Sequence, residues 1–180
     1  WGKWRALTID LDKGVDAERF DALLSHSIET RQSIQQSMLS SVVSQIHPNY
    51  DPKQNIPWVL SLGTRNRSNT SGRQVCVECL KSRENPPYLR LMWRIGWHCH
   101  CDRHRVCLID HCTECGATIQ PFKADLEHDC LAICTICGFD LRNFEGSKNI
   151  NLNALNFQNK ADQVLNQKVG FYNQSRVTSQ

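Results

Sequence analysis

Four pairs of metal-binding side chains recur along the middle of this 180-residue chain, each with two residues between its members. In order, the pairs are Cys76 and Cys79, Cys101 and His104, Cys112 and Cys115, and Cys134 and Cys137. Two intervening residues let the backbone turn into a knuckle whose two side chains converge on one tetrahedral ion. Gly116 and Gly138 directly follow the third and fourth pairs, and glycine tolerates the positive φ that often ends such a turn. The spacing therefore predicts metal sites built from paired ligands.

Taken in sequence order, the pairs form two sites with every ligand position filled by protein. The first and second pairs form the first site, with 21 residues between them. The third and fourth pairs form the second site, and their spacer of 18 residues is typical of a zinc ribbon. Thiolate and imidazole ligands favour Zn²⁺, so we expect two zinc ions per chain. No open position remains to activate water, and both sites are therefore expected to be structural.

The ligand order leaves one other grouping open. In a RING-like module, a protein-interaction fold of the ubiquitin-ligase type, the first pair shares an ion with the third and the second with the fourth. Seven residues separate His104 from Cys112, where a RING has two or three. We therefore favour the sequential grouping and keep the RING-like module as the alternative.

Ten cysteines could also mean disulfides or catalytic thiols, but their repeated pairing favours metal binding in a reducing compartment. Three cysteines have no matching partner, at Cys99, Cys107 and Cys130, and their roles stay open. Four histidines are likewise left over, at His98, His100, His111 and His128. The sequence has no metalloprotease motif, phosphate-binding loop or nucleophile elbow, and we expect a protein that is not an enzyme.

The elements before the paired ligands are predicted to be helical, over residues 1–55. Asp16 can cap a first helix, in which apolar residues recur three and four positions apart. Ser27 or Thr30 can cap a second helix, running from Arg31 to Ile46 and ending before a proline. Two helices joined by a short link suit a helical hairpin, and a DNA-binding helix-turn-helix is one form of it.

The remaining residues are predicted to be a double zinc-finger module, residues 56–146, and an Asn/Gln-rich C-terminal helix and tail, residues 147–180. Within the module, residues 88–97 can form an amphipathic helix. Asn151 or Asn153 can cap the C-terminal helix. The expected fold class is small α+β or mostly α, with a helical segment followed by two tandem zinc-stabilised modules of irregular loops. The chain begins with tryptophan, so we expect a fragment of a longer protein.

Charge is concentrated in the middle of the chain, although the formal net charge is only +3. Residues 65–123 carry ten basic and five acidic side chains. Three thiolates and an imidazole around Zn²⁺ carry a formal −1, and four thiolates −2, so bulk charge does not predict nucleic-acid binding. A local patch is required, and five arginines are the candidates, at Arg65, Arg67, Arg73, Arg90 and Arg94. The sequence has no run of eighteen apolar residues, and we expect no membrane partner.

The order of motifs over residues 56–140 resembles the TniQ/TnsD family of transposon target-selection proteins. The upstream segment Trp58-Val59-Leu60-Ser61-Leu62-Gly63 is similar to a motif of that family. The other matching residues are the four ligand pairs together with Leu80, Tyr88, Arg90, Trp93, Arg94, Leu108, Gly116 and Gly138. The extra Cys99 and Cys107 depart from the family pattern.

The resemblance implies a non-enzymatic adaptor of a bacterial mobile element, which recruits a Tn-type transposition machinery to its target. Some members bind an attachment site on DNA, while others dimerise and dock on a CRISPR RNA-guided effector complex. We therefore expect a cytoplasmic protein whose partners are DNA or such a complex, other transposition proteins and, as in some members, a second copy of itself. The eight paired ligands carry over as metal ligands.

Overall fold

The computed structural model describes residues 10–45, 47, 49–51, 55–61, 72–82, 87–124, 130–167, 169–172 and 175–178. The chain divides into two compact units. The cysteine unit comprises residues 1–8 and 57–158, and it holds all ten cysteines. The helical unit comprises residues 9–56 and 159–180. The division of the chain into three domains at residues 55 and 146 stays a prediction.

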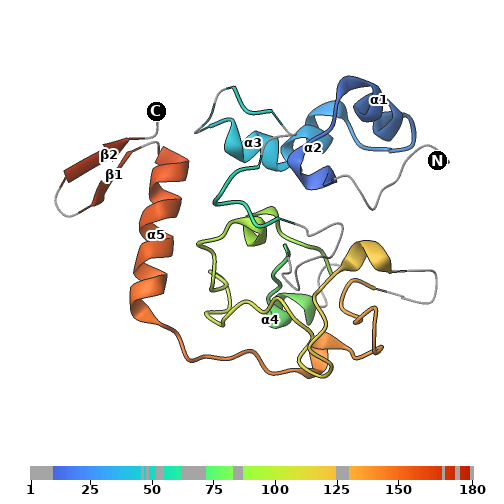
Figure 1. Ribbon diagram of the computed structural model, residues 1–180, viewed down its shortest axis with the longest axis vertical. Coiled ribbons are helices and arrows are strands. Elements are labelled where there is room, and N and C mark those ends of the chain that lie inside the picture. The colour runs from blue at the N-terminus through green and yellow to red at the C-terminus, as the bar shows by residue number, and fades with distance from the viewer. Residues whose placement is uncertain are drawn as a thin grey trace. The chain divides into compact units, whose positions relative to one another are not determined.

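The helical unit begins with a 3-10 turn, Leu11–Lys13, followed by three helices (Figure 1). Helix α1 spans Ala17–Ser25 and is capped as predicted, since the Asp16 carboxylate accepts a hydrogen bond from the backbone N–H of Arg19 at 3.0 Å. Helix α2 spans Arg31–Gln36 and is capped by Thr30, whose hydroxyl accepts from the N–H of Ser33 at 3.1 Å.

The predicted second helix is wrong in one respect, because it breaks after six residues. Met38 has an extended backbone (φ −101°, ψ 149°), and a separate helix α3 begins after it, spanning Leu39–Val43. The Ser37 hydroxyl donates to the carbonyl of Ile34 at 2.7 Å, and the Ser41 hydroxyl donates to that of Met38 at 2.6 Å. Serine hydroxyls that bond to nearby carbonyls compete with the regular helix ladder, which accounts for the break.

The C-terminal residues form a helix and a hairpin. Helix α5 spans Leu152–Gln167, and Asn151 caps it by accepting from the N–H groups of Asn153 and Ala154 at 3.0 and 3.2 Å. The tail predicted after this helix instead contains two strands. Strands β1, Val169–Tyr172, and β2, Ser175–Thr178, pair antiparallel, with Gly170 opposite Val177.

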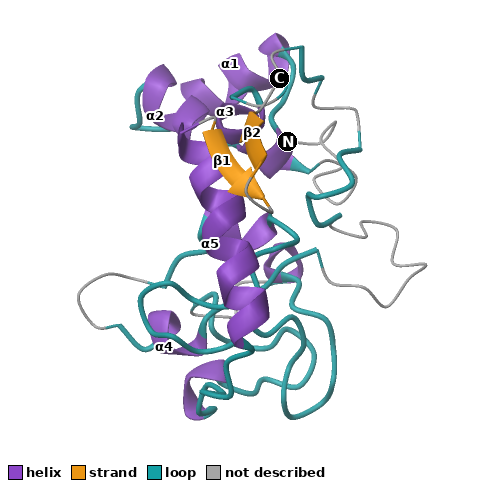
Figure 2. Ribbon diagram, turned by 90° about the vertical axis from the view of Figure 1, so that its left-hand side faces the viewer, coloured by secondary structure: helices purple, strands orange, loops and turns teal. Residues whose placement is uncertain are grey.

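The cysteine unit is mostly loop, as Figure 2 shows in teal. Its regular elements among the described residues are the short helix α4, Val77–Leu80, the first half of α5, and 3-10 turns at Leu91–Arg94, Pro121–Lys123 and Leu141–Asn143. The amphipathic helix expected over residues 88–97 is reduced to the first of these turns. The described chain is therefore mostly helical with little strand, and every helix in it is too short or too polar to span a bilayer.

Candidate metal centres

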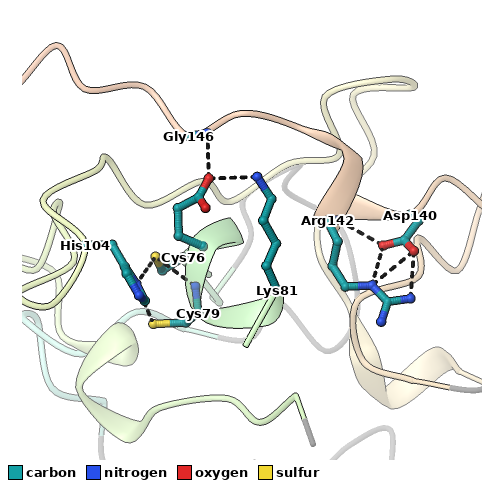
Figure 3. A network of polar contacts seen from close by, with 8 residues as sticks. Cys76, Cys79, Lys81, His104, Asp140, Arg142 and Gly146 are labelled. Atoms are coloured by element: carbon teal, nitrogen blue, oxygen red, sulfur yellow. Dashed lines mark hydrogen bonds and ion pairs between the residues drawn. The ribbon is translucent and has the colours of Figure 1, made fainter. Parts of the chain in front are cut away.

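The first pair of ligands is placed by helix α4. Cys76 precedes the helix as its N-cap, and its sulfur accepts a hydrogen bond from the backbone N–H of Cys79 at 3.4 Å. One helical turn therefore brings the two sulfurs to the same end of α4. The His104 ring approaches both of them, as Figure 3 shows.

The four side chains of the first site have the spacing that a tetrahedral zinc ion requires. His104 Nδ1 lies 3.5, 3.3 and 3.7 Å from the sulfurs of Cys76, Cys79 and Cys101. The sulfurs of Cys79 and Cys101 are 3.7 Å apart. Tetrahedral Zn–S and Zn–N bonds of ordinary length place two sulfurs about 3.8 Å apart and sulfur and nitrogen about 3.6 Å apart. The donor set and its geometry therefore fit zinc.

The second site has the same fit. Its four ligand atoms, from Cys112, Cys115, Cys134 and Cys137, all lie within 4.8 Å of one another. The sulfurs of Cys112 and Cys137 are 3.8 Å apart, and those of Cys115 and Cys134 are also 3.8 Å apart. This is the separation of two thiolates on one tetrahedral zinc ion.

Three of the four pairs share one backbone frame. In each of the three, the residue before the first ligand forms an isolated antiparallel bridge. The bridged residues are His100 and Cys107, His111 and Thr118, and Ile133 and Asp140. The N–H of the first ligand bonds to a carbonyl five residues on, at 2.8, 2.7 and 2.9 Å in the three knuckles. The N–H four residues after that ligand bonds back to the ligand's own carbonyl, at 2.9 Å in all three. Each knuckle is thus the tip of a small hairpin.

The two sites are joined by a common core. The hydrophobic cluster of the cysteine unit contains one sulfur ligand from each pair, Cys76, Cys101, Cys112 and Cys134. Val106 and Leu141 lie in the same cluster and are 1% and 2% exposed. The grouping of ligands is the sequential one, and the interleaved grouping of a RING is wrong for this chain, because the first pair shares its cluster with the second pair.

The thiols of each ligand set differ in acidity. The interaction of the Cys76 and Cys101 thiols lowers the pKa of Cys101 to about 4, while the same interaction and burial raise the pKa of Cys76. In the second site, burial raises the pKa of Cys134, but the backbone N–H groups of Cys137 and Ile136 outweigh it and bring the value to about 7. One thiol in each site is therefore close to the thiolate form that binds metal.

Residues 4–108 match the model of the TniQ family. This match covers more than half of the chain. The chain belongs to the TniQ family. TniQ proteins are non-catalytic accessory proteins of transposons, and the chain is accordingly a transposition-associated protein. Comparisons with curated proteins and with solved structures gave no significant match.

The TniQ match includes the first site and ends before the second. It also contains two segments whose motifs carry the resemblance, around Trp58 and around Trp93. The structure brings them together: Val59 forms an antiparallel bridge with Ile95, and the rings of Trp58 and Trp97 lie 5.3 Å apart. The two segments therefore pack together as one wall of the cysteine unit, and in the sequence both come before the second pair of ligands.

Arg94 belongs to this wall and is 1% exposed. Its Nε and Nη2 donate to the carbonyl of Leu60 at 3.2 and 2.7 Å. The prediction that Arg94 contacts phosphate is therefore wrong, since a phosphate contact needs a guanidinium that solvent can reach. Arg94 instead joins the two TniQ motif segments.

Arg90 lies beside the first site. Its guanidinium stacks 5.0 Å from the ring centroid of Tyr88 and 5.8 Å from that of Trp93. Burial raises the pKa of the Cys79 thiol, and a hydrogen bond from Arg90 opposes this rise. Arg73 is half-buried, and Arg65 and Arg67 lie outside the described residues.

The three unmatched cysteines lie outside both sets of metal ligands. Cys107 donates to the carbonyl of Asn149 at 3.6 Å, and the sulfur of Cys99 lies 3.1 Å from Nδ1 of His100. Cys130 lines a small cavity next to the second site, with a volume of about 20 Å³. None of these three sulfurs belongs to either ligand set.

A polar contact that sequence spacing does not reveal links helix α4 to the segment that follows the second site. The Glu78 carboxylate on α4 accepts from the Lys81 ammonium at 2.8 Å and from the N–H of Gly146 at 3.4 Å. A Cβ at Gly146 would meet the Val106 side chain at 3.0 Å, which explains a glycine there. As Figure 3 shows, the carboxylate of Asp140 pairs with Arg142, at 2.7 Å.

Gln158 on α5 is a second residue that sequence reasoning missed. It is fully buried, and its side-chain oxygen accepts from the N–H groups of Cys99 and His100 at 3.1 and 3.2 Å. Its Nε2 donates to the carbonyl of His100 at 3.1 Å and to Asp102 Oδ1 at 2.7 Å. Only the polar, internal position of Gln158 on an apolar helix face could have indicated such a contact from the sequence.

Proposed function

We propose that this TniQ protein is a non-enzymatic target-selection adaptor of a Tn-type transposition system. It binds target DNA, an RNA-guided CRISPR effector complex, or both, and recruits the other transposition proteins to that place. The observation that carries the proposal is the TniQ match over residues 4–108, which spans the three N-terminal helices and the complete first site.

The metal sites support this role as structural centres, with one Zn²⁺ bound by each set of four ligands. The cysteine unit has little regular structure, and four ligand sulfurs lie inside its only large hydrophobic cluster among the described residues. A structural zinc ion contributes about 10–16 kcal/mol in isolated fingers, which is more than such a small core supplies. The zinc ions would therefore hold the recognition surface in one shape.

Nucleic-acid contacts are proposed for the arginines of the basic middle segment, at Arg65, Arg67, Arg73 and Arg90. Arg94 is excluded by its burial. Because zinc binding brings the formal charge of the chain close to zero, binding is expected to depend on such local cations and to weaken with salt. A second copy of the chain is a further proposed partner.

The proposal is tested by reconstitution with zinc-loaded protein, the transposition proteins encoded beside it and the RNA-guided complex of the same element. We expect the chain to co-purify with at least one of these partners, and we expect targeted insertion to stop when the chain is omitted. The control is a chain in which serine replaces Cys130. Because Cys130 is outside both ligand sets, this chain is expected to support insertion as the wild type does. Insertion at the same target without the chain, together with no association, would show that the adaptor role is wrong.

A further inference from the structure

The knuckle of the first site differs from the other two in the residue that closes it. Gly116 and Gly138 close the knuckles of the second site with φ of 68° and 72°. Arg105 occupies the same place in the first site with φ of 53°, and it is the sole non-glycine residue with positive φ in the described part of the chain. Its N–H makes the same 2.9 Å bond to the first ligand's carbonyl as the two glycines do.

The residue that closes each of these three knuckles has a positive φ. Two of three equivalent turns use glycine, because the left-handed region disfavours any residue with a Cβ. Arg105 therefore makes the same backbone hydrogen bond that glycine makes in the other two turns, but in a strained conformation. A strained residue that the fold does not need is a reason to look for a role of its side chain.

The side chain of Arg105 is exposed, and so is that of Arg103, two residues earlier on the same knuckle. Neither guanidinium has a hydrogen-bond or ion-pair partner among the residues that the structure describes. In contrast, Arg142 pairs with Asp140 and Arg94 bonds to the carbonyl of Leu60. Arg103 and Arg105 are thus two arginines whose guanidinium groups face solvent.

The tips of the other knuckles have no such cations. Thr113 and Glu114 lie between the ligands of the third pair, and Thr135 and Ile136 between those of the fourth. At the first-site tip, the neighbouring Asp102 carboxylate is held by Gln158 at 2.7 Å. The basic tip, Arg103 with Arg105, is therefore a local feature of the first site and not a general property of the knuckles.

We propose that this basic tip binds the phosphodiester backbone of a nucleic acid. An arginine guanidinium matches phosphate oxygens in a two-bond geometry, and it stays charged at every physiological pH. His104 lies between the two arginines in the sequence, and a zinc ion bound at the first site would hold this turn rigid beneath the two guanidinium groups. This inference deepens the proposed function, on which it rests, by naming the surface that contacts nucleic acid.

The test uses the zinc-loaded full chain and compares Arg105→Gly and Arg103→Ala with Arg142→Ala. The control removes the same charge from an arginine that an ion pair already holds. Binding is measured by anisotropy over a range of salt, on a short duplex DNA, on an RNA–DNA hybrid of the same sequence and on a polyglutamate peptide. We expect each tip variant to reduce the slope of log K against log salt by about 0.9, which corresponds to about an eightfold loss at 0.1 M salt.

Arg105→Gly is expected to weaken binding while the zinc-loaded protein melts about 1–3 °C higher, because the strain at this turn is relieved. Arg142→Ala is expected to leave the slope unchanged. Equal binding of wild type and Arg105→Gly would overturn the inference but not the adaptor role. An equal loss on polyglutamate would overturn the assignment to phosphate. If the wild type binds neither nucleic acid, this inference and direct nucleic-acid recognition both fail, while docking on a protein partner still stands.

Discussion

Arg90 shows how one contact changes the interpretation of a residue. From the sequence it was a candidate for phosphate, but its guanidinium stacks on Tyr88 and opposes the rise in the pKa of the Cys79 thiol. Groups that bond to a metal ligand typically change metal affinity about 10–100-fold when removed. Arg90 is therefore expected to influence the first site as well as any ligand outside it.

We predict that Arg90→Gln speeds zinc loss from the first site about tenfold, because a neutral amide replaces the cation beside the Cys79 sulfur. Arg90→Lys keeps the charge but loses the planar stacking on the rings, and an intermediate rate is expected. The measurement is zinc transfer to a coloured chelator, with Arg142→Gln as the control away from the first site. Unchanged zinc release with a reduced salt slope for DNA binding would instead support the phosphate contact.

At the level of elements, Gln158 connects helix α5 to the second pair of ligands. The side chain satisfies two backbone N–H groups, at Cys99 and His100, in the segment that leads into the Cys101 knuckle. Removing a partner from a buried donor costs about 1–3 kcal/mol. The docking of the first half of α5 and the shape of this knuckle should therefore depend on each other.

We predict that Gln158→Ala increases amide hydrogen exchange at Cys99 and His100 about tenfold or more, in proportion to the lost stability. The matched control is Gln163→Ala on the same helix, where the side chain is exposed and bonds only to Gln167 among the described residues. Gln158→Glu keeps the acceptor but faces the Asp102 carboxylate, and adding Asp102→Asn should restore protection. Unchanged exchange in Gln158→Ala would contradict the link.

The sequence predicted local features of these elements better than distant ones. The Asp16 and Asn151 caps and the ligand pairs depend on residues two or three positions apart, and the structure has each of these arrangements. The break at Met38 was missed because serine hydroxyl bonds override an apolar period that continues through it. The Gln158 contact joins residues 58 positions apart, a separation that helix periodicity does not report.

At the scale of the whole molecule, the two sites belong to one core and not to two separate fingers. Cys101 from the first site and Cys112 from the second lie in the same hydrophobic cluster with Val106. The Glu78 carboxylate also joins α4 to Gly146, beyond the second site. Loss of either zinc ion should therefore disturb the packing around both sites.

We predict that the wild-type chain carries two zinc ions, that Cys134→Ser carries one, and that Cys130→Ser still carries two. Cys134 is 8% exposed and provides one of four sulfurs, so a serine there leaves three ligands and a partly buried hydroxyl. Metal content is measured after gel filtration.

Because Trp58, Trp93 and Trp97 all lie in the cysteine unit, their fluorescence reports its packing. A shared core requires the fluorescence of Cys134→Ser to shift even though its first site keeps zinc. An unchanged spectrum with one zinc retained would mean that the two sites fold independently.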